Sequence, residues 1–257
     1  MKKKLIQSIL RANQILDIVS ENNNGISLKE IANKLKLGSS TIFYLINTLI
    51  ETNYIIQREN KYKLGPKNLQ LGNYYLESLS LYKIALPILE DLLVKINESI
   101  LLYMVENNKF LELVKMESTH SVKPTRIVIN SNNANATAIG KVLISSLSKD
   151  ELKEFIKNNN LHKFTKNTII SLNKLYKELE KVRKDGYALD CEESEIGVNC
   201  IAAPIYNYKE EIKASIGFSI PTQRFSKKQI IKIIPLLKNG VAEISRLLGF
   251  NEKYDHF

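Results

Sequence analysis

Polar and aromatic side chains recur on one side of a short helix predicted between residues 39 and 49. Apolar residues return there at the three- and four-residue spacing of a helix with one buried face. The other positions point outward and carry hydroxyl, amide and aromatic groups, which can bond to base edges or pack on thymine methyl groups. The buried positions are Ile42, Leu45, Ile46 and Leu49, and the outward ones are Ser39, Ser40, Thr41, Phe43, Tyr44 and Asn47. We therefore predict that the outward residues contact the major groove of double-stranded DNA.

A second helix and a tight turn are predicted directly before this one. Ser27 and Glu30 have the spacing of a capping box, in which each side chain bonds to the amide of the other residue and so starts a helix. Gly38 is predicted to take a left-handed backbone in the turn, and Ser39 or Ser40 to cap the next helix. The pair forms a helix-turn-helix. The pattern alone also fits a helical hairpin with a solvated face.

A basic hairpin is predicted directly after the two helices. Residues 53–58 and 61–64 alternate between apolar and polar types as strands do, and residues 59–60 supply the turn between them. Such a hairpin is the wing of a winged helix-turn-helix, and basic side chains near its tip can reach phosphates or a minor groove. These side chains are Arg58, Lys61 and Lys63.

The charge of the chain favours a polyanionic partner. The 257 residues carry a formal net charge of +10, and residues 1–79 hold 11 basic against 6 acidic side chains. The rest of the chain holds 26 against 21, so the N-terminal part has the higher net charge per residue. A length of 257 residues also fits two domains, one small and one larger.

Several classes of protein are excluded by motifs that the sequence lacks. No apolar run approaches the roughly 18 residues of a membrane span, and no signal peptide is recognisable, so we expect no membrane partner and a cytoplasmic protein. Cys191 and Cys200 are too few for a disulfide framework, and the histidines lack zinc-binding spacing, so neither a metal nor a cofactor is expected. Nucleophile-elbow, phosphate-loop and zinc-protease motifs are also absent, so we assign no catalytic residue.

The remainder of the chain is predicted as a linker helix followed by an α+β domain. Pro66 suits the first turn of the linker, Pro87 is expected in the first turn of the next helix, and Ser148 with Glu151 forms another capping box. Strands are predicted at 99–105, 110–116, 125–129, 187–189, 199–206 and 212–220, and helices at 67–79, 84–96, 136–147, 152–157 and 171–185, with a last helix interrupted at Pro235. This order predicts an antiparallel sheet flanked by helices. The expected domains are 1–65, 66–80 and 81–257.

Characteristic motifs follow one another along the whole chain. The N-terminal ones are SILRANQILDIVS, SLKEIANKLKLGSSTIFYLINTL and YKLG. The C-terminal ones are NATAIGKVL, Thr168-Ile169 and RKDGYALDCEESEIGVNCIAAPIY. In these motifs the chain resembles the IclR family of bacterial transcription regulators. The resemblance implies a winged helix-turn-helix joined by a linker helix to a GAF-like effector-binding domain, acting as a homodimer or a dimer of dimers on palindromic operator DNA.

Two positions in the N-terminal part depart from the family pattern. Tyr44 stands where the family often has Arg, so an arginine contact to guanine or phosphate is missing and a different operator is expected. Asn53 stands at the start of the wing, where Gly is usual. Asn accepts the left-handed conformation better than most residues, so we expect the turn to survive.

A candidate ligand site lies in the second half of the chain. Residues 135–140 are small and polar at a predicted helix N-terminus, where free amides favour a carboxylate or phosphate. The family resemblance implies that an effector binds there, in contact with Ala138, Ile139, Asp190, Val198, Cys200, Gly217 and Ser219. Gly217 stands where relatives often carry a second hydroxyl, which implies one polar contact fewer. Alternatively, Cys200 is a small buried hydrophobe and Glu192-Glu193 a solvated acidic pair.

These patterns predict a DNA-binding transcription regulator that responds to a small metabolite, an organic acid or a sugar-acid derivative. Two alternatives come from other classes of protein. One is a metabolite sensor whose winged helix binds proteins, which the missing arginine favours, and the other is a GAF-like enzyme with an unrecognised site.

Overall fold

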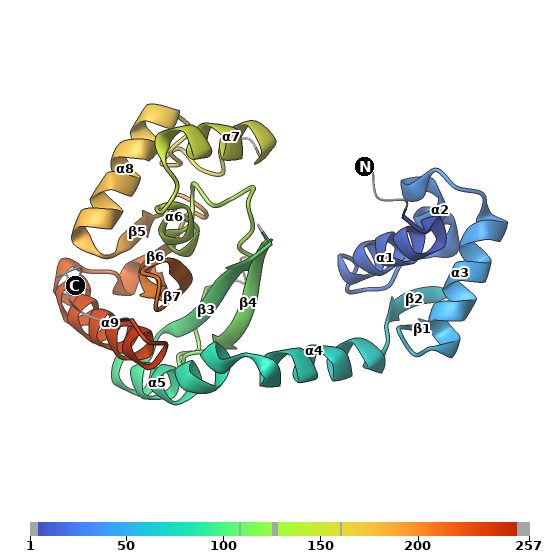
Figure 1. The fold of residues 1–257 in the computed structure, drawn as a ribbon, viewed down its shortest axis with the longest axis horizontal. Helices are drawn as coiled ribbons and strands as arrows, with labels where there is room; N and C mark the ends of the chain where they lie inside the picture. Colours follow the sequence, from blue (N-terminus) through green and yellow to red (C-terminus); the bar gives the residue numbers. More distant parts are fainter. Residues whose placement is uncertain (1–4, 108, 125–127, 160, 251–257) are drawn as a thin grey trace. The chain divides into compact units, whose positions relative to one another are not determined.

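The computed structural model describes residues 5–107, 109–124, 128–159 and 161–250 (Figure 1). The chain divides into two compact units, Met1–Ser78 and Leu79–Phe257, and each unit has a hydrophobic core of its own. None of the described helices is both long enough and apolar enough to cross a membrane.

The first unit contains three packed helices and a two-stranded antiparallel sheet. The elements are α1 (Gln7–Ser20), α2 (Leu28–Leu35), α3 (Ser39–Glu51), β1 (Ile55–Arg58) and β2 (Lys61–Leu64), followed by α4 (Pro66–Ser78). Apolar side chains from all three helices and both strands share one core, which includes Ile15, Ile31, Ile42, Ile46, Ile55 and Tyr62. The predicted winged helix-turn-helix is confirmed.

Both predicted capping boxes are present. The Ser27 amide donates to Oε2 of Glu30 at 2.9 Å, and the Glu30 amide donates back to Oγ of Ser27 at 3.4 Å. The Ser148 amide donates to Oε2 of Glu151 at 2.8 Å, and the Glu151 amide returns to Oγ of Ser148 at 3.3 Å. These bonds satisfy first-turn amides that have no partner within the helix, so they fix the starts of α2 and α7 (Lys149–Asn159).

The turn between α2 and α3 differs from the prediction in two details. Lys36 takes the left-handed backbone (φ 53°), whereas Gly38 has a φ of −63° and occupies the N-cap position of α3. Since Gly38 fills that position, neither Ser39 nor Ser40 caps the helix. Both serines instead lie exposed on its first turn.

The wing has the predicted hairpin register. β1 pairs antiparallel with β2, and Arg58 lies opposite Lys61 beside the turn. Asn53 takes the expected left-handed backbone, with a φ of 61°. Gly65 approaches it so closely that a Cβ on Gly65 would lie 2.3 Å from the Asn53 carbonyl oxygen. The exit from the wing therefore requires a glycine.

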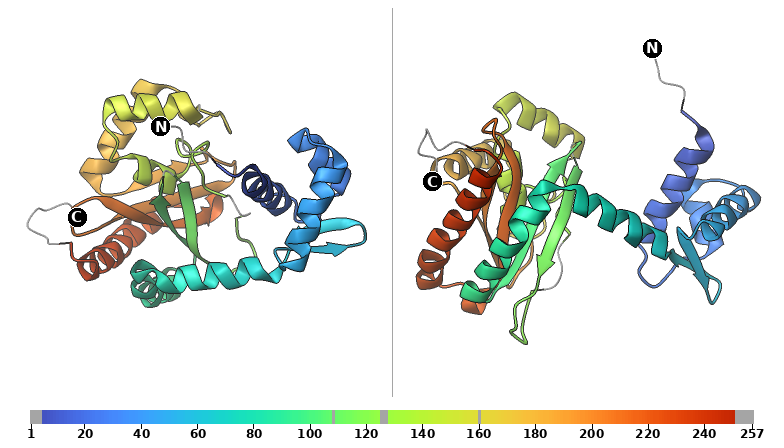
Figure 2. Two further views of the ribbon diagram at one scale, coloured as in Figure 1. Left: turned by 45° about the vertical axis from the view of Figure 1, so that its right-hand side comes forward. Right: turned by 60° about the horizontal axis from the view of Figure 1, so that its bottom comes forward.

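The second unit is a five-stranded antiparallel sheet with helices on both faces (Figure 2). The strand order is β4-β3-β7-β6-β5, with β3 (Ser99–Glu106), β4 (Lys109–Met116), β5 (Ala188–Cys191), β6 (Val198–Tyr206) and β7 (Ile212–Pro221). One face is covered by α5 (Ser80–Ile96) and α9 (Lys227–Leu247), which pack together. On the other face α6 (Ala138–Ile144) contacts the sheet and α8 (Leu172–Asp185), and η1 (Thr222–Arg224) follows β7. The α+β prediction is confirmed.

Two predictions made at prolines are wrong. α5 begins at Ser80, so Pro87 lies in its interior rather than in its first turn, and α9 continues through Pro235 without interruption. Each proline is exposed, so the carbonyl that loses its helical partner can bond to water while the opposite face stays packed. The strand predicted at 125–129 falls mostly on residues 125–127, which lie outside the described part of the chain, and Val128 and Ile129 are not in a strand.

Candidate functional site

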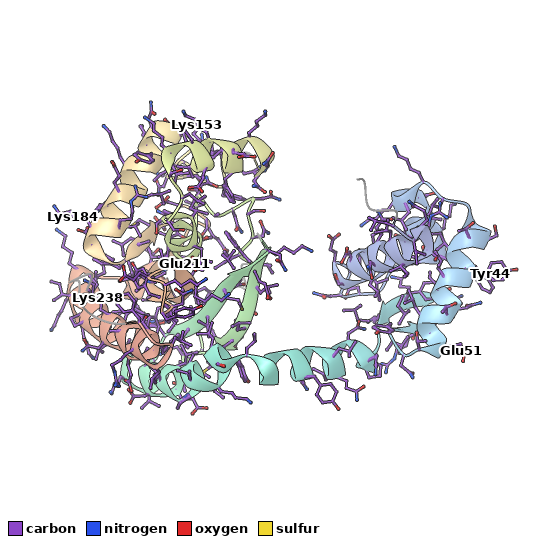
Figure 3. The ribbon with its side chains drawn as sticks, in the orientation of Figure 1. Tyr44, Glu51, Lys153, Lys184, Glu211 and Lys238 are labelled. Atoms are coloured by element: carbon purple, nitrogen blue, oxygen red, sulfur yellow. The ribbon has the colours of Figure 1, made fainter. Side chains whose placement is uncertain are left out.

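Helix α3 presents most of the predicted contact residues to solvent. Phe43 and Tyr44 are 47% and 72% exposed. Their rings meet edge to face with centroids 6.1 Å apart, and Tyr44 points away from the unit (Figure 3). Thr41 is exposed beside them, and Asn47 is half-buried further along the helix. This face carries hydroxyl, phenol and amide groups but no charge, so it suits base edges and methyl groups better than phosphates.

The three basic side chains of the wing are not equally accessible to a phosphate. Arg58 and Lys61 are exposed and lie directly opposite each other, where two like charges repel until an anion binds between them. Lys63 is half-buried because its stem lies against Gly25, where an added Cβ would be 3.2 Å from Cγ and Cε of Lys63. Lys63 therefore offers only the end of its side chain to a phosphate.

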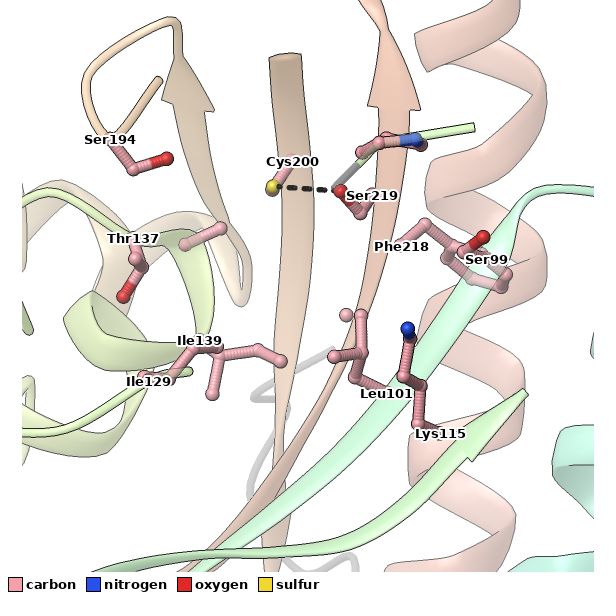
Figure 4. A pocket seen from close by; sticks show the side chains of 13 residues that line it. Ser99, Leu101, Lys115, Ile129, Thr137, Ile139, Ser194, Cys200, Phe218 and Ser219 are labelled. Atoms are coloured by element: carbon pink, nitrogen blue, oxygen red, sulfur yellow. Dashed lines mark hydrogen bonds between the residues drawn. The ribbon is translucent and has the colours of Figure 1, made fainter. Parts of the chain in front are cut away.

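A cavity of about 40 Å³ lies between α6 and the sheet of the second unit (Figure 4). Its sheet side is lined by Ser99, Leu101, Lys115, Cys200, Gly217 and Ser219. From the helix side, Thr137, Ala138 and Ile139 close it. The strand register arranges the sheet residues in rows across the strands, so residues distant in sequence meet here.

One of these rows is polar. Asp190 lies opposite Cys200, Cys200 opposite Ser219, and Ser219 opposite Ser99, so each of four strands contributes one side chain. The Cys200 Sγ atom lies 3.7 Å from Oγ of Ser219. Burial raises the pKa of the Cys200 thiol far above its ordinary value, and the nearby Asp190 carboxylate raises it further. The thiol therefore stays protonated and can donate a hydrogen bond.

Asp190 supports the cavity rather than lining it. Its fully buried carboxylate accepts hydrogen bonds from Oγ of Ser194 at 2.6 Å and from the Glu193 amide at 2.7 Å. Burial raises the pKa of Asp190, and these hydrogen bonds oppose the shift. The bonds hold Ser194 in place, and Ser194 lines the cavity.

A buried ion pair attaches the same loop to α6. Nζ of Lys141, which is fully buried, lies 2.6 Å from Oε1 of Glu193 and 3.9 Å from Oε1 of Glu178. Burial raises the pKa of Glu193, and the attraction of Lys141 opposes that shift. The alternative prediction that Glu193 belongs to a solvated acidic pair is therefore wrong. No group of three or more His, Cys, Asp or Glu side chains within the described ranges could hold a metal ion.

Two family models cover almost all of the chain. The model described as "Bacterial transcriptional regulator IclR C-terminal" matches residues 73–246, and the one described as "IclR helix-turn-helix domain" matches residues 8–59. The chain belongs to the IclR family. It is accordingly a DNA-binding transcription regulator with a C-terminal effector-binding domain and not an enzyme, which removes both alternatives from other classes.

IclR-family relatives match the chain over nearly its full length. The HTH-type transcriptional regulator XynR of Escherichia coli K12 is 31% identical over 248 residues, which are 96% of this chain and 98% of XynR. The structure of IclR from Thermotoga maritima is 29% identical and has a TM-score of 0.73, covering 95% of this chain and 99% of that one. An IclR homologue from Microbacterium hydrocarbonoxydans, solved with 4-hydroxybenzoate, shares the fold with a TM-score of 0.79 at 19% identity, covering 94% of this chain and 98% of that one.

Not all effector residues implied by the IclR resemblance line the cavity. Those that do are Ala138, Ile139, Cys200, Gly217 and Ser219. Asp190 lies behind Ser194, and Val198 is buried two residues before Cys200. At Gly217 the room for a side chain is filled by Ile139, whose Cγ1 atom would lie 2.8 Å from an added Cβ. Effector contacts of all seven residues stay a prediction.

Sequence reasoning missed several of the residues that line the cavity. They are Ser99, Leu101, Lys115, Pro124, Ile129, Ser194 and Phe218. Thr137, from the predicted segment 135–140, lines the cavity and also caps α6, because its Oγ1 accepts a hydrogen bond from the Gly140 amide at 3.2 Å. Ser99 and Lys115 enter the cavity only through the pairing of β3 with β7 and β4. The strand order is the signal that could have identified them.

Proposed function

We propose that this IclR-family regulator responds to a small organic acid. In this proposal residues 1–65 bind operator DNA, residues 66–80 link the two domains, and residues 81–257 bind the effector. The cavity between α6 and the sheet, with its few polar side chains, carries the proposal. Protein interiors are normally filled by closely packed side chains, and small-molecule sites are typically apolar hollows with a few polar groups, so a mainly apolar space that a few hydroxyl and thiol groups also line is best explained as a ligand site.

The chemistry of the cavity favours an acid that also carries hydroxyl groups. Ser99, Thr137, Ser194 and Ser219 bring hydroxyls and Cys200 brings a protonated thiol. An engineered cavity of roughly 150 Å³ holds benzene, whereas this one measures about 40 Å³. It therefore suits an acid of few heavy atoms, and a sugar acid would require the cavity to widen.

In the DNA-bound state we propose that α3 lies in the major groove. The residues that would meet bases there are Ser39, Ser40, Thr41, Phe43, Tyr44 and Asn47, while Arg58, Lys61 and Lys63 of the wing would contact the backbone or a minor groove. The exposed, uncharged face of α3 and the basic wing beside it support this division between base contacts and phosphate contacts.

We further propose that the functional unit is a homodimer or a dimer of dimers. Leu69, Leu71 and Tyr74 on α4 are 69%, 42% and 61% exposed. Leu71 and Tyr74, three residues apart, share one side of the helix. Large apolar side chains that stay exposed on a helix are typical of an interface between copies of a chain. Sedimentation velocity of the full-length protein should show dimers or tetramers, and a monomer at every concentration would contradict the proposal.

The effector acts by a difference in affinity between two arrangements of the assembled DNA-binding domains. A ligand that bound both arrangements equally would shift nothing, however tightly it bound. The proposal therefore requires that saturating effector changes operator affinity.

The DNA half of the proposal is tested by binding of the full-length protein to the promoter region of its own gene. Fluorescence anisotropy at moderate salt should show tighter binding to this duplex than to a shuffled duplex of the same length and composition. Equal affinity for both duplexes would overturn the predicted base contacts.

The effector half is tested with matched serine variants of one strand. Ser219→Ala should weaken effector binding without weakening operator binding by the free protein, because it removes a hydroxyl from the cavity. Ser215→Ala is the control, since Ser215 lies on the same strand but is buried away from the cavity, where its Oγ donates to the Ala203 carbonyl at 3.1 Å. Equal effects of both substitutions on effector affinity would contradict the proposed site.

A further inference from the structure

A cationic side chain stands at the edge of the cavity. Lys115 of β4 pairs with Leu101 of β3, which pairs with Gly217 of β7, so these three residues form the row beside the polar one. The Lys115 side chain is 24% exposed, and its amino group points into the space that the cavity residues surround (Figure 4). Among the described residues that line the cavity, Lys115 is the one with a positive charge.

The amino group of Lys115 already forms an ion pair within the protein. Oε1 of Glu117 lies 3.0 Å from Nζ of Lys115, and its other oxygen lies 2.5 Å from Nζ of Lys123. Lys123 and then Lys115 lower the pKa of Glu117 to about 2. Glu117 therefore has a second cationic partner that does not line the cavity, and it can give up Lys115 without losing every partner.

The opposite end of the cavity is unsuited to an anion. Asp190 is buried there behind Ser194, and it lies opposite Cys200 in the strand register. A carboxylate placed beside Cys200 would meet this buried negative charge, and a buried charge is costly unless an opposite charge pairs with it. Hydroxyl groups meet no such penalty at that end, since Ser194, Cys200 and Ser219 can all bond to them.

We propose that Lys115 is the residue that binds the carboxylate of the effector, which takes the place of Glu117 while Glu117 stays paired with Lys123. This inference rests on the proposed function and adds the charged contact and the orientation of the ligand. The carboxylate lies toward β4, and the hydroxylated end lies toward Ser194 and Cys200.

The test compares acids with their neutral amides. Calorimetry on the full-length protein uses glycolate, lactate and glycerate, each beside its own amide, which keeps the shape and removes the charge. Hydrogen bonds to a charged group are worth roughly 1.5–3 kcal/mol, so a bound acid should be preferred to its amide by roughly tenfold to a hundredfold. Lys115→Met should remove this preference and leave the affinity for the amide little changed.

Two further variants keep the result interpretable. Lys123→Met is the matched control, because Lys123 binds the same Glu117 carboxylate but lies outside the cavity lining, and it should retain the preference for acids. Glu117→Gln should strengthen acid binding severalfold, because it removes the competing carboxylate from Lys115.

The outcomes separate this inference from the proposed function. Loss of the acid preference in Lys115→Met but not in Lys123→Met supports the inference. Acid binding that survives Lys115→Met unchanged, or that Glu117→Gln fails to strengthen, overturns the inference and leaves the effector site in place. If neither acids nor amides bind the wild-type protein, the proposed organic-acid effector fails and the inference fails with it.

Discussion

The fully buried amino group of Lys141 lies 2.6 Å from Oε1 of Glu193, so an ion pair attaches α6 to the loop after β5. Both elements contribute residues to the cavity, through Ile139 and Ser194. The pair is isolated from solvent, and a buried charge that loses its partner has no water to replace it.

Breaking this pair should destabilise the second unit strongly. Lys141→Met leaves the Glu193 carboxylate buried without its partner, which costs about 3–5 kcal/mol of the free energy of unfolding. Lys95→Met is the control, because Lys95 forms an equally short but exposed pair with Asp91, at 2.6 Å, and exposed pairs contribute less than about 1 kcal/mol. Urea denaturation followed by circular dichroism measures both, and similar small losses would show that the buried pair is not structural.

Asp190 should make the stability of the second unit depend on pH. Its pKa is raised by burial, so between the ordinary aspartate value of about 4 and the raised value the unfolded chain has released a proton that the folded chain retains. Stability is therefore highest below this interval and falls as the pH rises through it. Asp190→Asn removes the titration, so the free energy of unfolding of the variant, measured relative to wild type, should rise with pH across the interval. A difference independent of pH in denaturation at several pH values would contradict the assignment.

Two glycines give opposite predictions for substitution by alanine. Gly65→Ala would place a Cβ 2.3 Å from the Asn53 carbonyl oxygen, which the backbone cannot avoid, so the first unit should lose about 2–3 kcal/mol or more. Gly72→Ala is the control, because Gly72 is exposed within α4 with no atom within 4 Å of the added Cβ. Alanine should raise the helix propensity there by up to about 1 kcal/mol. Thermal unfolding distinguishes the two, and a stable Gly65→Ala variant would contradict the close approach.

Contacts to bases and contacts to phosphates should respond differently to mutation. Tyr44→Ala or Thr41→Ala should relax the preference among operator variants, with each lost base contact worth about 1–3 kcal/mol. Lys61→Ala should weaken binding to all sequences alike and reduce the slope of log affinity against log salt concentration by roughly one. Anisotropy titrations at several salt concentrations measure both effects, and a uniform loss in Tyr44→Ala would place Tyr44 outside the groove.

Most of the fold could be predicted because its signals are local. The capping boxes at Ser27 and Ser148 and the left-handed Asn53 each depend on a few neighbouring residues, and all three are confirmed. Pro87 and Pro235 misled the prediction, because each lies on the solvent side of a long helix whose other face is packed. Packing of that face outweighs the single lost hydrogen bond, and no local pattern reports it.

The candidate site was only partly predictable, because the pairing of strands that are distant in sequence leaves no local pattern. Cys200 and Ser219 followed from family motifs, and the structure places them opposite each other. Ser99 reaches the same space because β3 pairs with β7, which begins more than 100 residues after β3 ends, and Lys115 reaches it through β4, the hairpin partner of β3. The prediction of Gly38 as the left-handed residue also failed, because Lys36 accepts that conformation where α2 ends.

The two thiols of the chain differ in their surroundings, and this difference has a practical use. Cys191 is exposed at the end of β5, directly before the loop that carries Ser194, whereas Cys200 is half-buried in the lining of the cavity. Burial raises the pKa of both thiols, and that of Cys200 by far the more. An alkylating fluorophore should therefore attach selectively at Cys191. The dye would then report on occupancy of the cavity without any change to the side chains that line it.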